Sequence, residues 1–443
     1  MKILHINTYD KGGGAEQFAF DFVHYDYSKL EENSESIETK LLVKRKKTDS
    51  LKVEILHRPL SSHVLEKIDK GFHKIIKHTF FSDLSVIKNL HHTFENLQKN
   101  EFYQKVDIIH LHNIHYDFFD FNDLIKIAKQ KHIVWTLHDM WAITGGEAHT
   151  FDSENYKKGI GKTPYGAFHP LLNPIIDRRQ SYLEQKKHIY STINQLKGSE
   201  KHNFVFVPVS NWLATCLEQS FVYPKQIESK ESKNTISIQT IQNGIDTTVF
   251  KNLNRRNWNT KRILFFNSDN PYKGAALFEN IIPQLNQTTD FELIIVGKEL
   301  SKNTLNSIPT TKVTHLKPIY DREKMNELYN SVDILVFPSR AENFSLLILE
   351  AMATGIFVLG STAGGIKEQL AANKDEKTRG LLFENENQKD LLDKMDLVLN
   401  MPLKELREKG NTASLFVKEN WNVEKMRAKY VELYKKILFS NSI

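Results

Sequence analysis

Cysteine is almost absent from this chain, since Cys216 is the only one among 443 residues. A single thiol excludes an intrachain disulfide, and such scarcity is typical of a reducing compartment. Long apolar runs are also absent: the longest, Phe344–Gly360, is interrupted by Glu350 and Gly355 and is shorter than the roughly 18 apolar residues of a membrane span. The opening segment, Met1–Asn7, is typical of a buried strand and lacks the features of a signal peptide. We therefore expect a cytoplasmic protein.

Neither sign of charge dominates the sequence. The net charge of +6 arises from 60 basic and 54 acidic residues, and hydrophobic residues make up 40% of the chain. These values are typical of a globular protein of two or three domains, and we predict no nucleic-acid partner. The densest basic run, Lys44–Lys47, is interpreted as a solvated strand end, with contact to a membrane surface as the alternative.

Short β-branched runs alternate with stretches of helical period along the whole chain. This alternation predicts an α/β fold with doubly wound parallel sheets, one in each half. The strands expected in the first half are Lys2–Asn7, Thr39–Val43, Asp107–His112, His132–Leu137 and Phe204–Pro208. Those expected in the second half are Arg262–Asn267, Phe291–Val296, Val313–Lys317, Ile334–Phe337 and Ile356–Leu359.

The segment 334–368 carries the strongest functional signal. An expected strand ends at Pro338-Ser339, Glu342 lies in the following loop, and Glu350 lies inside the next expected helix. A Gly364-Gly365 turn then precedes another helix. Ligands of open α/β sheets bind at this carboxyl edge, where the start of a helix offers unpaired N–H groups to a phosphate.

This Glu-x7-Glu arrangement, with the downstream Glu-Ala-Met-Ala-Thr-Gly and Gly-Gly-x-x-Glu, resembles retaining glycosyltransferases of the GT-B fold, in particular glycosyltransferase family 4. The resemblance covers nearly the whole chain and is strongest at 334–368. It implies two Rossmann-like domains that face a cleft. We expect an acceptor-binding domain at 1–250, a donor-binding domain at 251–420, and a terminal helix at 421–443 that crosses back onto the first domain. The Asn243-Gly244-Ile245-Asp246 segment resembles the family's turn at the interdomain link.

A glycine-rich loop, Lys11–Glu16, follows the first expected strand and begins the first helix. Three interpretations remain open for it. A dinucleotide site is disfavoured because Gln17 replaces the third glycine and the second strand ends in Lys44-Arg45 instead of an acidic residue. The loop also resembles the glycine loop near the cleft of family-4 enzymes, in which Gly13 and Gly14 would approach the ligand, and a purely structural turn is the third possibility.

Histidines gather at the end of the third expected strand, where His110, His112 and His115 follow one another closely. This spacing suggests metal ligation, but no carboxylates with suitable spacing accompany it. A contact in the cleft through His112 or Asn113 is the interpretation that we favour, and we predict no metal site.

Two further segments resemble motifs of the family. Thr136–Trp141 matches the motif whose histidine faces the donor sugar, which assigns that role to His138. Pro271–Gly274 matches the segment whose lysine, here Lys273, pairs with the donor diphosphate. The family's frequent upstream arginine is replaced, and Asn267 stands at the matching place.

The resemblance implies transfer of a sugar from a nucleoside-diphosphate sugar to a hydroxyl of a glycan or lipid-linked glycan, with retention, in the biosynthesis of surface polysaccharides. Lys273 would stabilise the leaving diphosphate, Glu342 would contact the transferred sugar, and Glu350 would bind the ribose hydroxyls. The donor is a co-substrate and no cofactor is expected. No Asp-x-Asp occurs in the sequence, which is consistent with a reaction that needs no metal.

Two other functions remain as alternatives. One is another GT-B enzyme that acts on nucleotide sugars, such as a phosphorylase or an epimerase, and the other is a subunit that binds a sugar nucleotide without turnover. The long loop expected at 140–173 would select the acceptor, and any association with a membrane would be peripheral, at its inner face.

Overall fold

The computed structural model describes residues 1–29, 37–56, 93–115, 119–151, 153–161, 179–197, 202–224, 235–285, 290–307, 312–370 and 379–439. These residues form two compact units. The first comprises Met1–Val209, Leu213–Ile241 and Arg427–Ile443, and the second comprises Ser210–Trp212 and Gln242–Met426. The chain therefore leaves the first unit in its middle and returns to it at its end.

The first unit contains a seven-stranded sheet in the order β3-β2-β1-β4-β5-β6-β7, with all neighbouring strands parallel. Its strands are β1 (Lys2–Tyr9), β2 (Glu38–Arg45), β3 (Val53–Ile55), β4 (Ile108–Leu111), β5 (His132–Leu137), β6 (Phe204–Pro208) and β7 (Ile236–Ile238). The central strands are buried along their length, as parallel strands covered on both faces must be.

The second unit contains a six-stranded parallel sheet in the order β10-β9-β8-β11-β12-β13. Its strands are β8 (Lys261–Asn267), β9 (Phe291–Gly297), β10 (Lys312–Leu316), β11 (Ile334–Phe337), β12 (Phe357–Ser361) and β13 (Leu381–Phe383). Both sheets begin with the same doubly wound order, so the predicted fold class is confirmed.

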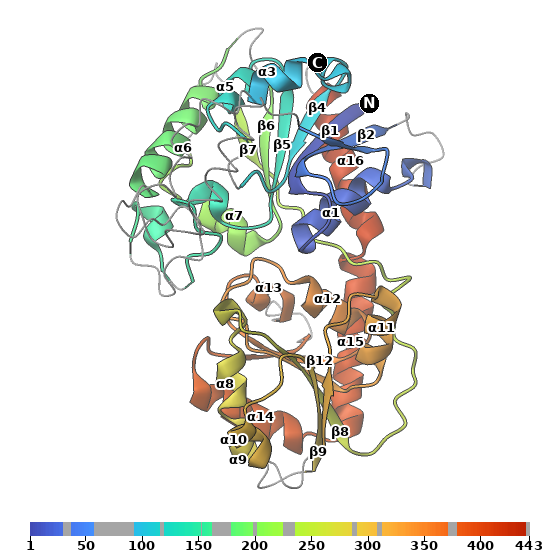
Figure 1. Cartoon of the computed structure of the whole chain (residues 1–443). Coiled ribbons are helices and arrows are strands. Elements are labelled where there is room, and N and C mark those ends of the chain that lie inside the picture. Colours follow the sequence, from blue (N-terminus) through green and yellow to red (C-terminus); the bar gives the residue numbers. More distant parts are fainter. Residues whose placement is uncertain are drawn as a thin grey trace, which may run out of the picture. The chain divides into compact units, whose positions relative to one another are not determined.

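Helices flank each sheet (Figure 1). Those of the first half are α1 (Gly14–His24), η1 (Tyr27–Lys29), α3 (Thr93–Gln98), α4 (Glu101–Gln104), α5 (Asp123–Ala128), η4 (Trp141–Ile143), η5 (Asn155–Lys157), α6 (Arg179–Asn194) and α7 (Asn211–Glu218). Those of the second half are η7 (Pro271–Lys273), α8 (Ala275–Glu279), α9 (Ile282–Leu285), α10 (Lys302–Asn306), α11 (Arg322–Asn330), α12 (Leu346–Ala353), α13 (Ile366–Leu370), α14 (Gln388–Asn400), α15 (Leu403–Asn420) and α16 (Val423–Phe439).

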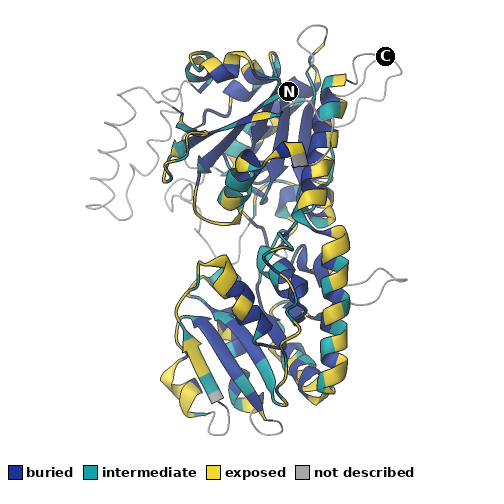
Figure 2. Ribbon diagram, turned by 90° about the vertical axis from the view of Figure 1, so that its right-hand side faces the viewer, coloured by how far each residue is buried: buried dark blue, intermediate teal, exposed yellow. Residues whose placement is uncertain are grey.

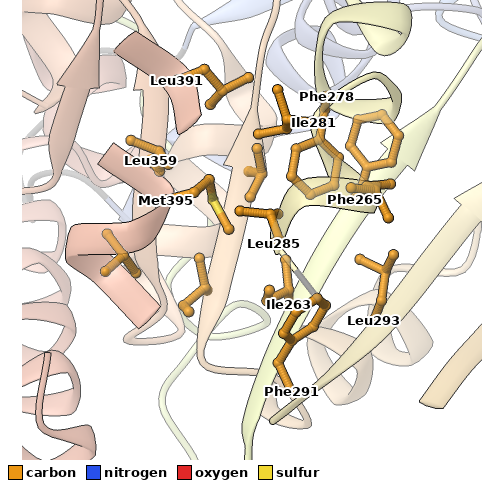
Figure 3. Close-up of a cluster of buried hydrophobic side chains, with 14 of the residues drawn as sticks. Ile263, Phe265, Phe278, Ile281, Leu285, Phe291, Leu293, Leu359, Leu391 and Met395 are labelled. Carbon is orange, nitrogen blue, oxygen red and sulfur yellow. The ribbon is translucent and has the colours of Figure 1, made fainter. Parts of the chain in front are cut away.

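Burial is concentrated in the strands and on the helix faces that cover them (Figure 2). In the second unit, the side chains of Ile263, Phe265 and Leu293 on the sheet pack against Phe278 and Met395 on the helices, and form one continuous apolar cluster (Figure 3). Removal of this apolar surface from water is the main force that holds the helices on the sheet. The cluster makes the sheet a rigid support for the loops at its carboxyl edge.

Each sheet has one place where the strand order reverses. In the first unit this switch lies between β1 and β4, and His5 is paired in register with His110 there. In the second unit it lies between β8 and β11, where Ile263 is paired with Ile334. Because the crevice beyond such a switch binds ligands in open α/β sheets, the loops that follow these four strands are the first place to look for a site.

Three short strands, β3, β7 and β13, are absent from the predicted strand ranges, because three-residue runs carry little periodicity. The polar segment 228–235 predicts a surface loop, and it lies outside the described residues except for Thr235. Over the described part of the chain, no helix combines the length and the apolarity that crossing a membrane requires.

Candidate functional site

A short turn after β8 brings Lys273 to the carboxyl edge of the second sheet. Asn270 caps the turn by accepting a hydrogen bond from the Tyr272 N–H at 3.0 Å, and Gly274 ends it in the left-handed region at φ 64°. A Cβ atom on Gly274 would lie 1.9 Å from the carbonyl oxygen of Pro338. Glycine therefore lets this turn pack directly against the end of β11.

The same packing places Lys273 against Glu342. The Nζ atom of Lys273 lies 2.6 Å from Oε1 of Glu342, and the Ser339 hydroxyl donates to the same oxygen at 2.9 Å. The Glu342 side chain is 13% exposed, whereas that of Lys273 is 40% exposed. The carboxylate is thus held inside the edge while the ammonium group stays accessible to an incoming anion. Ser339 is a member of this cluster to which the sequence analysis gave no role.

The glycine pair at 364–365 supports the backbone of the same loop. Gly364 has a φ of 49°, and the Gly365 N–H donates to the carbonyl oxygen of Glu342 at 3.0 Å. A Cβ atom on Gly365 would lie 1.9 Å from the Asn343 carbonyl oxygen. These glycines consequently fix the course of the chain around Glu342, whatever they contact in a ligand.

Glu368, the last residue of the Gly-Gly-x-x-Glu motif, holds the start of α7. Its carboxylate accepts hydrogen bonds from the Asn211 N–H at 2.8 Å and from the Gln242 side chain at 2.6 Å. A carboxylate at the first turn of a helix satisfies unpaired N–H groups there. In the structure, this glutamate therefore has a structural task.

Glu350 lies on α12, the helix that follows the loop of Glu342, and its carboxylate does not contact Lys273 but a tyrosine. The hydroxyl of Tyr329 on α11 donates to its Oε2 at 2.9 Å. Burial raises the pKa of Glu350 to about 7, although the Tyr329 hydroxyl and the charge of Arg322 both act to lower it. The side chain is therefore poised to change charge near neutral pH. Tyr329 has no motif around it, and only the packing of α11 on α12 reveals it.

Asn267 ends β8 and is mostly buried. Its side-chain amide donates to the Glu299 carbonyl oxygen at 3.3 Å, and its own carbonyl oxygen accepts from the Lys298 N–H at 3.1 Å. The residue thus ties the ends of β8 and β9 together at the edge that carries Lys273.

In the first unit, the glycine loop is anchored from behind. Asp10 is buried, and its carboxylate accepts hydrogen bonds from the backbone N–H groups of Lys47 and Thr48 at 2.7 and 2.9 Å. The ammonium group of Lys47 donates to the Lys11 carbonyl oxygen at 2.9 Å. Gly13 is the N-cap of α1 and Gly14 is its first residue. At least this lysine of the basic run therefore helps to hold the glycine loop.

A chain of imidazoles lies at the switch of the first sheet. His112 on the loop after β4 lies between His5 on β1 and His138 after β5, at nitrogen-to-nitrogen distances of 3.0 and 3.2 Å. His112 is buried and both of its ring nitrogens are engaged, whereas His138 is only half-buried. Of the two, His138 is therefore the side chain better placed to meet a ligand.

His110 belongs to a second set of contacts. Its Nε2 lies 2.7 Å from the Thr136 hydroxyl and its Nδ1 lies 2.7 Å from the hydroxyl of Tyr434 on α16. The Thr136 hydroxyl in turn lies 2.8 Å from that of Tyr430. The end of the chain is thus fastened to β4 and β5 of the first sheet by two buried tyrosines.

The structure regroups the histidines that were considered for a metal. Within the described residues, ring nitrogens of His5, His110 and His112 lie within 4.8 Å of one another, a spacing that could hold an ion. Because hydroxyl groups engage both nitrogens of His110, a metal would have to displace one of them. His115 lies apart from this set, 3.6 Å from Asp139 and beside the Trp141 ring.

Asn113, the other candidate contact, follows β4 and donates its backbone N–H to the Asn7 side chain at 3.0 Å.

The described part of the loop after His138 is held by contacts with α6. Lys186 is buried and donates to the Thr144 carbonyl oxygen at 2.8 Å, and Arg179 lies 3.0 Å from Glu147. Residue 152 and residues 162–173 of the loop predicted at 140–173 lie outside the described residues.

The sequence of this chain is similar to those of known glycosyltransferases. Residues 246–414 match the family of glycosyl transferases group 1. The chain is 23% identical over 350 residues to the putative colanic acid biosynthesis glycosyl transferase WcaC of Escherichia coli, covering 71% of this chain and 79% of that protein. It is 24% identical over 270 residues to an MMP alpha-(1->4)-mannosyltransferase of Mycolicibacterium hassiacum, covering 60% of this chain and 59% of that protein.

Two solved structures show the same fold along nearly the whole chain. Sucrose-phosphate synthase from Thermosynechococcus elongatus has a TM-score of 0.64 at 15% identity, and covers 99% of each chain. Anabaena HepE in complex with UDP-glucose has a TM-score of 0.56 at 14% identity, and covers 98% of this chain and 100% of that one. These likenesses establish the two-domain GT-B fold.

Proposed function

We propose that this chain, a glycosyltransferase whose residues 246–414 match group 1, moves a sugar from a nucleoside-diphosphate sugar to a hydroxyl of a glycan or lipid-linked glycan, with retention at the anomeric carbon. The observation that carries the proposal is the cluster of Lys273, Glu342 and Ser339 at the switch of the second sheet. The name of the Escherichia coli relative supports surface polysaccharide biosynthesis as the setting.

In the second unit, we assign the donor to the loops after β8, β11 and β12. Lys273 would stabilise the negative charge that develops on the leaving diphosphate, an interaction that is strong when the donor group is held in place beforehand. Glu342 would bind the transferred sugar, and Glu350 in its ionised form would accept hydrogen bonds from the ribose hydroxyls. Asn267, Gly364 and Gly365 would line the diphosphate.

In the first unit, we assign contact with the sugar to His138, and we place Gly13 and Gly14 beside the donor. Asn113 remains a candidate for contact with the acceptor. Because Lys273 is positioned to neutralise the diphosphate, we propose a reaction that needs no metal ion. We assign no nucleophile, since the Glu342 carboxylate is already engaged by an ammonium group and a hydroxyl.

A screen for donors tests the proposal. The full chain is heated with UDP-, GDP-, ADP- and TDP-sugars in turn, because a ligand that binds only the folded protein raises its melting temperature. We expect the sugars of one nucleoside diphosphate to raise the melting temperature of the parent protein. We expect them to leave the melting temperature of the Lys273→Met variant unchanged. The donor that binds is then incubated with lipid-linked acceptors, and the anomeric configuration of the product is determined by NMR.

Each result of the screen has a defined meaning. A product with the donor's anomeric configuration supports retaining transfer, and an inverted product contradicts it. Release of a free sugar phosphate or conversion of the donor without an acceptor would indicate a phosphorylase or an epimerase. Binding without any turnover would indicate a subunit that only binds the nucleotide sugar.

A further inference from the structure

Three imidazoles of the first unit form one hydrogen-bonded chain. His5 Nδ1 lies 3.0 Å from His112 Nε2, and His112 Nδ1 lies 3.2 Å from His138 Nε2. The three rings lie nearly parallel, with interplanar angles of 12° and 23° between successive pairs. We propose that His5 and His112 are positioning residues that hold His138 in one tautomer, with its proton on Nδ1, and so make it a fixed hydrogen-bond donor.

The three imidazoles are neutral because His5 and His112 are buried and the half-buried His138 packs against them. Burial lowers the pKa of His5 and of His138 to about 3, and it holds the pKa of His112 well below the usual value, with the neighbouring histidines adding to the effect there. At neutral pH each ring therefore carries one proton. None of the three can donate from both nitrogens.

Neutrality couples the three tautomers. Each of the two hydrogen bonds needs one N–H and one lone pair. If His112 donates from Nδ1 to His138, its Nε2 must accept from His5 Nδ1, and His138 keeps its proton on Nδ1. If His112 donates from Nε2, every proton moves to the other nitrogen of its ring. The chain consequently has only two arrangements.

The inner end of the chain selects between them. His5 is fully buried, and among the described residues its Nε2 has no hydrogen-bond partner. In the first arrangement His5 Nε2 is unprotonated and carries a lone pair that accepts no hydrogen bond. In the second it is an N–H group without an acceptor, and orphaned buried N–H groups are rarer in proteins than acceptors with unused lone pairs. The first arrangement is therefore the favoured one.

The consequence appears at the outer end of the chain. With Nε2 of His138 accepting from His112, the proton lies on Nδ1, the ring nitrogen that remains for a ligand. The ring of Phe18 packs edge-on against His138 with centroids 5.1 Å apart, which limits its rotation. His138 then offers a neutral N–H to an oxygen of the ligand, and the statement that this oxygen belongs to a sugar rests on the proposed function.

Two substitutions of His112 distinguish its hydrogen bond to His5 from its hydrogen bond to His138. An asparagine places its amide near the position of the imidazole Nδ1, and a glutamine places it near Nε2. His112→Asn can still donate to His138 but loses the link to His5. His112→Gln keeps the link to His5 but loses the one to His138. The two variants are similar in polarity and burial, so a purely structural role for His112 would affect them alike.

The tautomer is measured directly by NMR of the full chain, deuterated and labelled with ¹⁵N in its histidine rings, without any substrate. His138→Ala identifies the signals of His138. In the parent protein we expect a protonated Nδ1 and an unprotonated Nε2 at His138. We expect His112→Asn to keep this pattern and His112→Gln to lose it. His110→Gln is the control, because His110 is a neighbouring buried histidine that is not one of the three hydrogen-bonded imidazoles. This variant should keep the parental protonation pattern of His138.

Two results would overturn the inference: a proton on His138 Nε2 in the parent protein, or the same His138 pattern in the asparagine and glutamine variants. An activity measurement with the donor found in the screen adds the functional consequence, which we expect to be a turnover about tenfold lower in His112→Gln than in His112→Asn, as for one lost hydrogen bond. Because the NMR experiment uses no donor, it can succeed or fail independently of the proposed glycosyl transfer.

Discussion

The ammonium group of Lys273 lies 2.6 Å from Glu342 Oε1, so the cation assigned to the leaving diphosphate already has an anionic partner. The Lys273 side chain is 40% exposed, and an ion pair with that much access to water contributes only about 0–1 kcal/mol. A diphosphate can therefore displace Glu342 from Lys273, or share Lys273 with it, at little cost in free energy. Glu342 acts on the donor in two ways, as a proposed ligand of the sugar and as a competitor of the phosphates.

The competition predicts opposite effects of Glu342→Gln on binding and on turnover. Neutralising the carboxylate releases Lys273, so a nucleoside diphosphate should bind about twofold to fivefold more tightly, which corresponds to the weak ion pair that is lost. Turnover should fall, because the sugar loses its ionised ligand. Calorimetric titration with UDP, GDP, ADP and TDP measures the first effect. Ser339→Ala is the matched control, since it removes the hydroxyl from the same carboxylate and leaves the charge pair, and unchanged or weaker binding in Glu342→Gln would contradict the prediction.

Lys273→Met and Glu342→Ala should each lower turnover by about a hundredfold or more, the usual effect of removing one preorganised electrostatic partner. Initial rates with the donor found in the screen test this. Lys298→Met serves as the control, because Lys298 is an exposed lysine in the same unit, paired with the exposed Asp269. Parental rates in both site variants would mean that the site has been assigned to the wrong loops.

Glu350 should make stability depend on pH near neutrality. Burial raises the pKa of its carboxyl to about 7, whereas the unfolded chain titrates near the ordinary value of 4.5. Between these values the folded protein holds a proton that the unfolded chain has lost, so stability falls as the pH rises from about 4.5 to about 7 and then levels off. The free energy of unfolding should change by about 3 kcal/mol at most over this range, because a shift of one pKa unit corresponds to about 1.4 kcal/mol.

Glu350→Gln measures this contribution, since it carries no charge at any pH. Unfolding by urea should find the variant more stable, relative to the parent, at about pH 8 than at about pH 5. Tyr329→Phe removes a hydrogen bond that lowers the pKa of Glu350, so its fall in stability should extend to higher pH. A constant difference between Glu350→Gln and the parent across this range would show that the carboxyl titrates normally.

Several parts of this molecule could be predicted from the sequence because the signal is local. The alternation of short β-branched runs with helical stretches gave the two parallel sheets, and the glycines and prolines around Lys273 and Glu342 marked the turns that carry them. The pairing of those two side chains follows from a general property of doubly wound sheets, since the loops after neighbouring central strands meet at one edge.

Other parts depend on register and packing between segments far apart in the sequence. His5 lies beside His110 only because β1 and β4 pair in that register, and no feature near residue 5 indicates it. Tyr329 meets Glu350 because α11 packs on α12, and a tyrosine on a helix face is usually part of the core. Sequence spacing grouped His115 with His110 and His112, whereas the turn after β4 takes it to Asp139.

Gly274→Ala should damage the site through the backbone. The residue has a φ of 64°, and a Cβ atom would lie 1.9 Å from the Pro338 carbonyl oxygen, so the turn must move away from β11. We expect a loss of about 1–3 kcal/mol of stability and a fall in turnover, because Lys273 moves with the turn. Gly12→Ala is the control, since its nearest neighbours would be atoms of the flexible Glu16 side chain at 3.4 Å. Equal stability of the two variants would argue against this close approach.

The hydroxyl of Tyr434 should contribute to the attachment of the last helix to the first unit. Tyr434 on α16 lies 2.7 Å from the Nδ1 of buried His110, so Tyr434→Phe leaves that nitrogen without this partner and should cost about 1–3 kcal/mol. Tyr430→Phe should cost less, because the Thr136 hydroxyl that it contacts keeps the Nε2 of His110 as a partner.

Hydrogen–deuterium exchange locates the effect, since local opening is read separately in each segment. Although residue 434 lies near the end of the chain, faster exchange in Tyr434→Phe should appear in β4 and β5, which are near its beginning, and β8 and β11 should be unchanged. Because the chain forms two compact units, a global melting curve would mix their transitions, whereas exchange in β4 and β11 reports on each unit by itself. Equal acceleration in β4 and β11 would show that α16 stabilises the chain as a whole and not the first sheet through His110.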